Sequence, residues 1–191
     1  PSKPNVWRNV YTITKEASEE IAKRYNENYP TRICSLRLFN AYGPHQHLVP
    51  VRKIVPVFAA QARLGLPLQI WGNGKQTVDL IYTYDIAQIV VDFTRLGCPE
   101  ILDLGRGIPV TVMEVADMVN EHFNNKSGIK QMPMRIGETP DTLLVADISK
   151  LRDKIEVKFS DLKQSMKQTL DFYQNLPEQE IKSCLEFYGI I

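Results

Sequence analysis

Tyr11 and Lys15 stand four residues apart in a segment that has helical spacing and contains neither Gly nor Pro. On a helix this spacing places the phenol and the ammonium on one face, with Cβ atoms about 5 to 6 Å apart. A free tyrosine titrates near pH 10, so a tyrosine base at neutral pH needs its phenolate stabilised by about 4 kcal/mol. A neighbouring lysine supplies part of that stabilisation. The pair therefore suggests a proton-transfer site, although on its own it is not specific.

The composition excludes several classes of function. A chain of 191 residues that is 43% hydrophobic and 24% charged can bury a sizeable core, as one domain or two small ones. Its formal charge is +1, so we expect neither nucleic acid nor a membrane surface as partner. Its 3 cysteines show no metal-type spacing, which predicts reduced thiols and a cytoplasmic location. No apolar stretch approaches the roughly 18 residues needed to span a bilayer.

Helical and strand-like segments alternate along the chain. Helices are predicted at residues 10–28, 54–64, 85–96, 112–123, 161–175 and 178–187, and strands at 32–39, 68–71, 76–82 and 100–104. Asp85 and Thr111 are the predicted N-caps of two of these helices. The alternation favours an α/β fold.

The order of these segments predicts two interleaved parts. Residues 1–44 and 85–107 are expected to form the C-terminal part of a larger doubly wound sheet. Residues 45–84 and 108–191 are expected to form a smaller α/β lobe. The loop that follows the strand at 32–39 contains the turn residues Gly43 and Pro44. Loops at the carboxyl ends of strands often bind ligands in α/β proteins, so this loop is a candidate site.

Five segments, in this order, resemble the extended short-chain dehydrogenase/reductase group, specifically the NAD-dependent sugar-nucleotide epimerases and dehydratases. They are Tyr11-Thr12-Ile13-Thr14-Lys15 with Glu19, Arg37 to Gln46, Leu66 to Gln76 with the following Asp79 to Ala87, Arg135-Ile136-Gly137-Glu138, and Ala146-Asp147-Ile148-Ser149-Lys150. Each motif is modest alone. Together they follow the family's order and are distributed across nearly the whole chain, which makes the resemblance specific.

The resemblance implies that residues 1–44 and 85–107 belong to a Rossmann-type domain that binds NAD as cofactor, and that residues 45–84 and 108–191 form the lobe that binds the sugar nucleotide. Tyr11 would be the general base that removes a proton from a sugar hydroxyl as hydride passes to the nicotinamide. Lys15 would bind the nicotinamide ribose and stabilise the phenolate. Leu38 would lie against the cofactor.

The resemblance also implies a site for a nucleotide sugar, with a UDP-hexose as the expected substrate. Asn40 would donate to the sugar nucleotide, and Arg135 would pair with its diphosphate through a planar charged fork. Glu138 would accept from the ribose hydroxyls. Leu68 and Trp71 would lie along the base, where backbone groups or the indole ring could hold a pyrimidine.

The sequence departs from the family pattern in two places. Val78 stands where most members have an arginine, and Lys75 and Arg52 are the candidate substitutes for this lost phosphate contact. The Gly-rich phosphate loop and the catalytic Ser or Thr upstream of Tyr11 are also absent from the sequence. The four or five βα units that the expected Rossmann domain lacks here would correspond to roughly 120 to 150 residues. We therefore expect the chain to be the C-terminal half of an enzyme, and to bind NAD poorly and be inactive on its own.

Three functions remain open at this point. The first is a UDP-hexose 4-epimerase that works through a transient 4-keto sugar, and the second is a nucleotide-sugar 4,6-dehydratase. The third is a non-catalytic remnant that binds a nucleotide sugar. Family members are usually homodimers through a helix bundle, and residues 10–28 are the expected contribution here.

Other polar residues have plainer interpretations. His45 and His47 could ligate a metal, but no third ligand is evident and a surface loop explains them better. Residues 105–107 form a Gly-Arg-Gly segment that reads as a turn after a strand and not as a nucleotide motif. Arg37 is expected in an ion pair or at a sheet edge.

Overall fold

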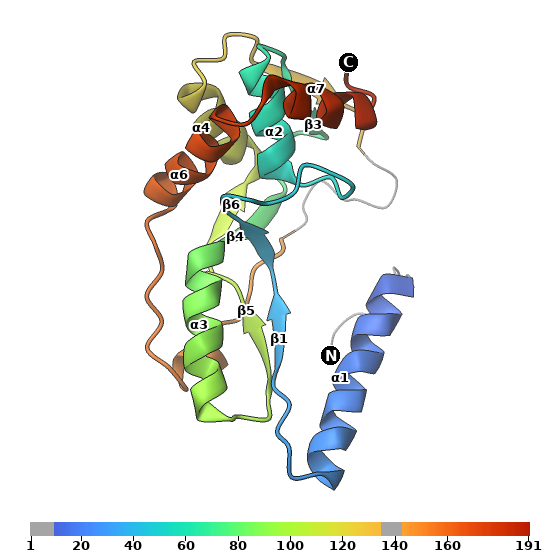
Figure 1. Cartoon of the computed structure of the whole chain (residues 1–191), viewed down its shortest axis with the longest axis vertical. Helices are drawn as coiled ribbons and strands as arrows, with labels where there is room; N and C mark the ends of the chain where they lie inside the picture. The colour runs from blue at the N-terminus through green and yellow to red at the C-terminus, as the bar shows by residue number, and fades with distance from the viewer. Residues whose placement is uncertain (1–9, 135–142) are drawn as a thin grey trace.

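The computed structural model describes residues 10–134 and 143–191. The molecule is elongated, with helix α1 (Val10–Asn28) beside strand β1 (Ser35–Leu38) near one end and a cluster of helices at the other (Figure 1). Strand β1 pairs in parallel with β5 (Ile101–Leu104), with Ser35 opposite Ile101. Among the described residues, no strand pairs with the other edge of β1.

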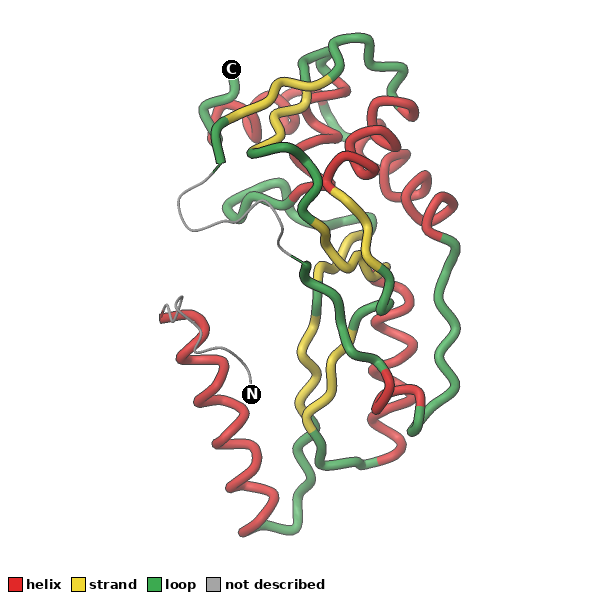
Figure 2. Tube along the Cα trace, turned by 180° about the vertical axis from the view of Figure 1, so that it is seen from behind, coloured by secondary structure: helices red, strands yellow, loops and turns green. Residues whose placement is uncertain are grey.

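Two further sheets continue along the long axis (Figure 2). In the middle sheet, β4 (Thr77–Tyr82) pairs in parallel with β2 (Asn40–Tyr42) and antiparallel with β6 (Pro109–Thr111). In the third sheet, β3 (Leu68–Trp71) pairs in parallel with β7 (Ile129–Met132). These parallel pairs confirm the expected α/β class.

Helices α2 to α7 pack in three apolar clusters among the described residues. Helices α2 (Ile54–Arg63), α4 (Val112–His122) and α6 (Leu162–Gln174) pack with β2, β3 and β4, and α7 (Glu178–Phe187) packs on α2. Helices α3 (Thr83–Leu96) and α5 (Ser149–Arg152) pack with β1 and β5 in a second core. Ala146, Ile148, Leu151 and the segment 155–159 belong to this second core. The domain boundaries stay a prediction.

One of the two predicted helix caps is confirmed and the other is wrong. Thr111 caps α4 in a capping box, in which its hydroxyl accepts from the Glu114 N–H and Glu114 accepts from the Thr111 N–H. Helix α3 instead begins at Thr83, so Asp85 lies inside its first turn. The Asp85 carboxylate is buried and accepts from the N–H and hydroxyl of Ser160, at 3.0 and 2.6 Å. The Asp85 carboxylate therefore binds a residue distant in sequence and does not cap the helix.

A buried carboxylate of the middle sheet joins β4 to two other segments. Asp79 of β4 is 0% exposed and accepts from the N–H groups of Arg106, Gly107 and Ala146, at 2.7, 2.9 and 3.0 Å. The segment 105–107 is therefore a turn, as expected, and its amides bind an anion of the protein itself. Consecutive N–H groups in such a turn favour a negative charge.

Within the described ranges, no helix is long and apolar enough to cross a membrane.

Candidate active site

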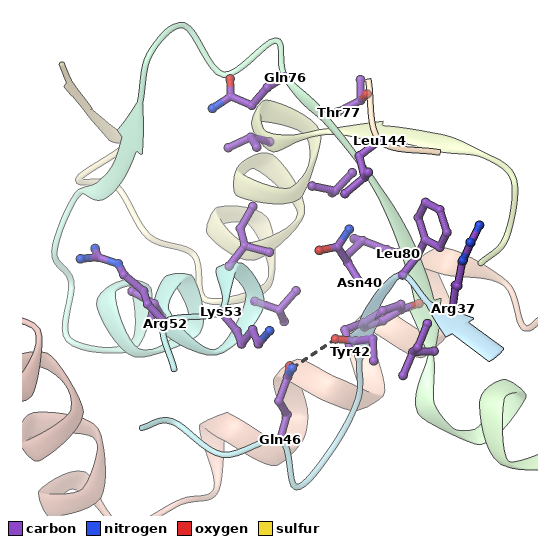
Figure 3. A pocket seen from close by; sticks show the side chains of 18 of the residues that line it. Arg37, Asn40, Tyr42, Gln46, Arg52, Lys53, Gln76, Thr77, Leu80 and Leu144 are labelled. Atoms are coloured by element: carbon purple, nitrogen blue, oxygen red, sulfur yellow. Dashed lines mark hydrogen bonds between the residues drawn. The ribbon is translucent and has the colours of Figure 1, made fainter. Parts of the chain in front are cut away.

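A cleft of about 1060 Å³ runs along the face shared by α1, β1, β2, β3, β4 and the start of α2. Its lining includes Tyr11 and Lys15 of α1, Asn40 of β2 and Trp71 of β3. Figure 3 shows Asn40 between Arg37 and Arg52, which lie at opposite ends of the view. The length of the cleft and the range of elements around it suit an extended ligand.

Tyr11 and Lys15 are brought together as the four-residue spacing predicts. The Lys15 Nζ lies 5.3 Å from the centroid of the Tyr11 ring, and both residues line the cleft. The Tyr11 side chain is 67% exposed, so its hydroxyl is accessible to a ligand. Leu38, at the end of β1, also lines the cleft and is 50% exposed. The geometry permits the predicted roles of all three residues, which stay predictions.

An ion pair fixes α1 to the sheet beside this pair. The Arg37 guanidinium donates to both carboxylate oxygens of Glu19, at 2.7 and 2.8 Å, and lies 3.7 Å from Asp103. The hydrogen bond from Arg37 lowers the pKa of Glu19 below its ordinary value. The expectation that Arg37 forms an ion pair is confirmed. Because Glu19 is two turns beyond Tyr11, this contact sets where the tyrosine stands.

Three amide side chains in the cleft carry buried atoms without a hydrogen-bond partner in the protein. These atoms are Asn40 Nδ2, Gln46 Oε1 and Gln76 Oε1. The other ends of both glutamines are occupied, since Gln46 Nε2 donates to the Ala41 carbonyl and Gln76 Nε2 donates to the Trp71 carbonyl. An unsatisfied buried polar atom costs about 1 to 3 kcal/mol, so these groups are suited to a polar ligand.

The side chains of β3 alternate between the core and the cleft. Gln69 and Trp71 line the cleft, and the core residue Ile70 borders it from below. Leu68 is 0% exposed, packs in the core and does not line the cleft. Strand alternation explains this placement, because side chains two apart lie on one face. Any contact of Leu68 with a nucleotide is thus left to its backbone. Trp71 stays a predicted binding residue.

The charges along the described lining favour an anion. Lys15, Arg37, Arg52 and Lys53 are the lining cations, and Glu19 is the lining carboxylate. Val78 also lines the cleft on β4. Of the two candidate substitutes for an arginine at that position, Arg52 lines the cleft and Lys75 does not. Arg135 and Glu138 lie outside the described residues.

The sequence did not single out Gln46 and Gln76 as binding residues, although both occur in quoted motifs. Amides are common on protein surfaces, and only burial of their unpaired atoms marks these two. A second hollow of about 660 Å³ contains His45, His47 and Phe172, and the rings of His45 and Phe172 lie 4.4 Å apart. No group of potential metal ligands occurs in the part of the chain that the structure describes.

Comparisons with known proteins place these features in a family. The model for the NAD dependent epimerase/dehydratase family matches residues 2–105. The chain is 25% identical over 168 residues to dTDP-4-dehydro-6-deoxy-D-allose reductase of Streptomyces bikiniensis, covering 87% of this chain and 51% of that protein. It is 26% identical over 187 residues to dTDP-glucose 4,6-dehydratase of Xanthomonas campestris, covering 91% of this chain and 50% of that protein.

Among solved structures, an epimerase from Methanothermobacter thermautotrophicus superposes with a TM-score of 0.83 at 26% identity. The match covers 91% of this chain and 52% of that one. The Rossmann-type α/β class expected from the sequence is confirmed. The chain spans about half the length of the curated relatives that it matches.

Proposed function

The chain belongs to the NAD dependent epimerase/dehydratase family, and from that premise we propose that it is the C-terminal half of a nucleotide-sugar 4-epimerase whose substrate is a UDP-hexose. One observation carries the proposal: Tyr11 and Lys15 line the same cleft as Asn40, which presents a buried, unpaired donor. A proton acceptor and a polar ligand contact thus share one space. The surplus of cations along the described lining suits a diphosphate.

The residues present fit NAD on the α1 side of the cleft. Lys15 would hold the nicotinamide ribose, and Leu38, half exposed at the end of β1, would provide apolar contact. NAD, when bound, supplies the acceptor for a hydride. Tyr11 would take the proton of the sugar C4 hydroxyl, and would return it after the sugar has turned. The Lys15 Nζ lies 5.3 Å from the Tyr11 ring centroid, so the two side chains can contact one ligand.

The middle of the cleft is apolar, which suits an epimerase. A 4-epimerase must let its 4-keto sugar turn, which requires weakly directional contacts. Val78, Leu80 and Leu144 supply an apolar wall there.

We also propose that the protein is a homodimer through α1. Val10, Ile13 and Ile21 on this helix are 78%, 51% and 67% exposed. Such apolar side chains on one helix are suited to a helical interface. Light scattering after size exclusion gives twice the chain mass if the proposal is right, and Ile21→Asp then shifts the protein to the monomer.

The test of the function is an assay with UDP-glucose and NAD, read by the sugar products, on the chain joined to the Gly-rich NAD-binding half that activity is expected to need. A 4-epimerase yields UDP-galactose and no 4-keto-6-deoxy product, and Tyr11→Phe lowers kcat by about 10² to 10⁴, the usual contribution of a general base. Thr12→Ala on the same helix, which is outside the lining, is the matched control. A 4-keto-6-deoxy product would instead indicate a dehydratase. Tight binding of UDP-glucose without turnover would support a non-catalytic binding protein.

A further inference from the structure

Two of the three cysteines lie together where the β1–β5 pair begins. Both are half-buried, carry free thiols and pack against the apolar core that contains residues of α3, α5, β1 and β5. The paired residues of the two strands start with Ser35 opposite Ile101. Cys34 therefore enters β1 beside Glu100, and Cys98 lies two residues before Glu100 on the neighbouring segment.

One residue, Glu100, contacts both thiols. The Cys98 Sγ donates to Glu100 Oε1 at 3.2 Å. Burial raises the pKa of the Cys34 thiol to about 11, the nearby Cys98 thiol adds to this increase, and a hydrogen bond from the Glu100 backbone opposes it. The two thiols are thus electrostatic neighbours on either side of one residue. The raised pKa keeps Cys34 protonated at neutral pH, where a thiol reacts slowly.

The two backbones are placed so that a small shift can close a bond between the sulfurs. Diagonal neighbours on adjacent strands have Cα atoms about 7 to 8 Å apart, whereas a disulfide spans about 4.4 to 6.8 Å. Cys34 and Cys98 both precede the paired residues of the ladder. A movement of about 1 Å in these two lead-in segments therefore brings the sulfurs within bonding reach without breaking the strand pairing.

We propose that Cys34 and Cys98 are a reversible oxidation site, in which a disulfide fastens the start of β1 to the connection between α3 and β5. The oxidant is a low-molecular-weight disulfide of the glutathione class. The Cys98 thiolate attacks one sulfur of the oxidant, which breaks its S–S bond, forms a mixed disulfide on Cys98 and releases one thiol. The Cys34 thiolate then attacks the Cys98 sulfur and releases the second thiol. Two cysteine thiols are oxidised, one oxidant disulfide is reduced, and both protons end on the released thiols.

Cys98 is the thiol placed to react first. It directly follows the exposed Gly97 in the connection after α3. Burial raises the pKa of Cys98 and its hydrogen bond to Glu100 adds to this, whereas the positive charges of Lys154 and Arg32 oppose it. These two cations also attract an oxidant that carries carboxylate groups, as glutathione disulfide does.

The test exposes the full chain to oxidised glutathione in the absence of oxygen at about pH 8.5, where the thiolate fraction is larger than at neutral pH. Unreacted thiols are then blocked, and mass spectrometry reads the intact chain and the peptides of an unreduced digest. The variants are Cys34→Ser and Cys98→Ser. Cys184→Ser is the matched control, because Cys184 packs in a different cluster with residues of α2 and α7. Circular dichroism establishes that each variant is folded.

We expect the wild type and Cys184→Ser to lose two hydrogens, about 2 Da, and to yield one linked pair of peptides that contains Cys34 and Cys98. Cys34→Ser should stop at the mixed disulfide, with one glutathione on Cys98. Cys98→Ser should form no internal bond. The oxidised wild type should unfold at a higher Tm than the reduced chain, because the bond restricts the unfolded chain.

The other outcomes overturn the inference, and none of them bears on the proposed function. Separate glutathione adducts on Cys34 and Cys98 without a linked peptide would show that the thiols lie too far apart to close. A bond that uses Cys184, a bond between two chains, or thiols that stay unreacted would overturn it as well. A lower Tm after oxidation would show that the bond strains the sheet and does not fasten it.

Discussion

Replacing Asp79 by Asn should strongly destabilise the protein, although the two side chains have nearly the same shape. The carboxylate is 0% exposed and accepts three backbone hydrogen bonds, one at Oδ1 from Arg106 and two at Oδ2 from Gly107 and Ala146. Asn retains one oxygen. In its better orientation, that oxygen accepts from Gly107 and Ala146. The new NH2 group then faces the N–H of Arg106, which is left without an acceptor.

The magnitude follows from these three bonds. A buried donor left without an acceptor costs about 1 to 3 kcal/mol, and each remaining bond loses about 1 kcal/mol when the acceptor loses its charge. The free energy of unfolding should therefore fall by about 3 to 5 kcal/mol. Urea unfolding followed by circular dichroism measures this change, since the midpoint shifts in proportion.

Asp117→Asn is the matched control, because Asp117 lies exposed on α4. Its effect should stay within about 0.5 kcal/mol, as for most surface substitutions. A loss of less than about 1 kcal/mol in Asp79→Asn would refute the reasoning, since it would mean that the three amides find other acceptors at little cost.

Two further predictions concern the same framework. Gly105→Ala should lower the free energy of unfolding by about 1 to 3 kcal/mol, because the added Cβ would lie 2.5 Å from Asp79 Oδ2, as thermal unfolding would show. Glu19→Gln should remove part of the acid sensitivity of the Tm. Arg37 lowers the pKa of Glu19 in the folded state, so its stabilisation is present above the ordinary pKa of 4.5 and is lost as the pH falls below it. The Arg37 side chain is 56% exposed, so the effect should stay below about 1 kcal/mol, and identical Tm profiles from pH 3 to 7 would count against it.

The helices and the longer strands could be predicted because their patterns are local. The segment 10–28 forms α1 as its spacing indicated, and the strand at 68–71 has the expected bounds. Strand β7 was missed because most of its residues are exposed and its sequence lacks apolar alternation. It forms because β3 offers it a parallel edge, which is a tertiary effect.

The site could be predicted where a motif has its own chemistry, and less well where the fold assigns the role. The Tyr11 and Lys15 pair and the Asn40 position both line the cleft as expected. The unpaired atoms of Gln46 and Gln76 depend on burial, which no local pattern reveals. Asp85 illustrates the same limit, because its partner Ser160 is distant in sequence and overrides the local capping preference.

The most direct test of the central claim is hydrogen–deuterium exchange of the chain with and without UDP-glucose. The account predicts that exchange slows in peptides from α1, β2, β3 and the start of α2, which together surround the cleft. Peptides from α3, on the other side of the β1–β5 pair, should exchange at the same rate in both samples. Slowed exchange confined to the hollow around His45 and Phe172, or no change anywhere at a saturating concentration, would contradict the account.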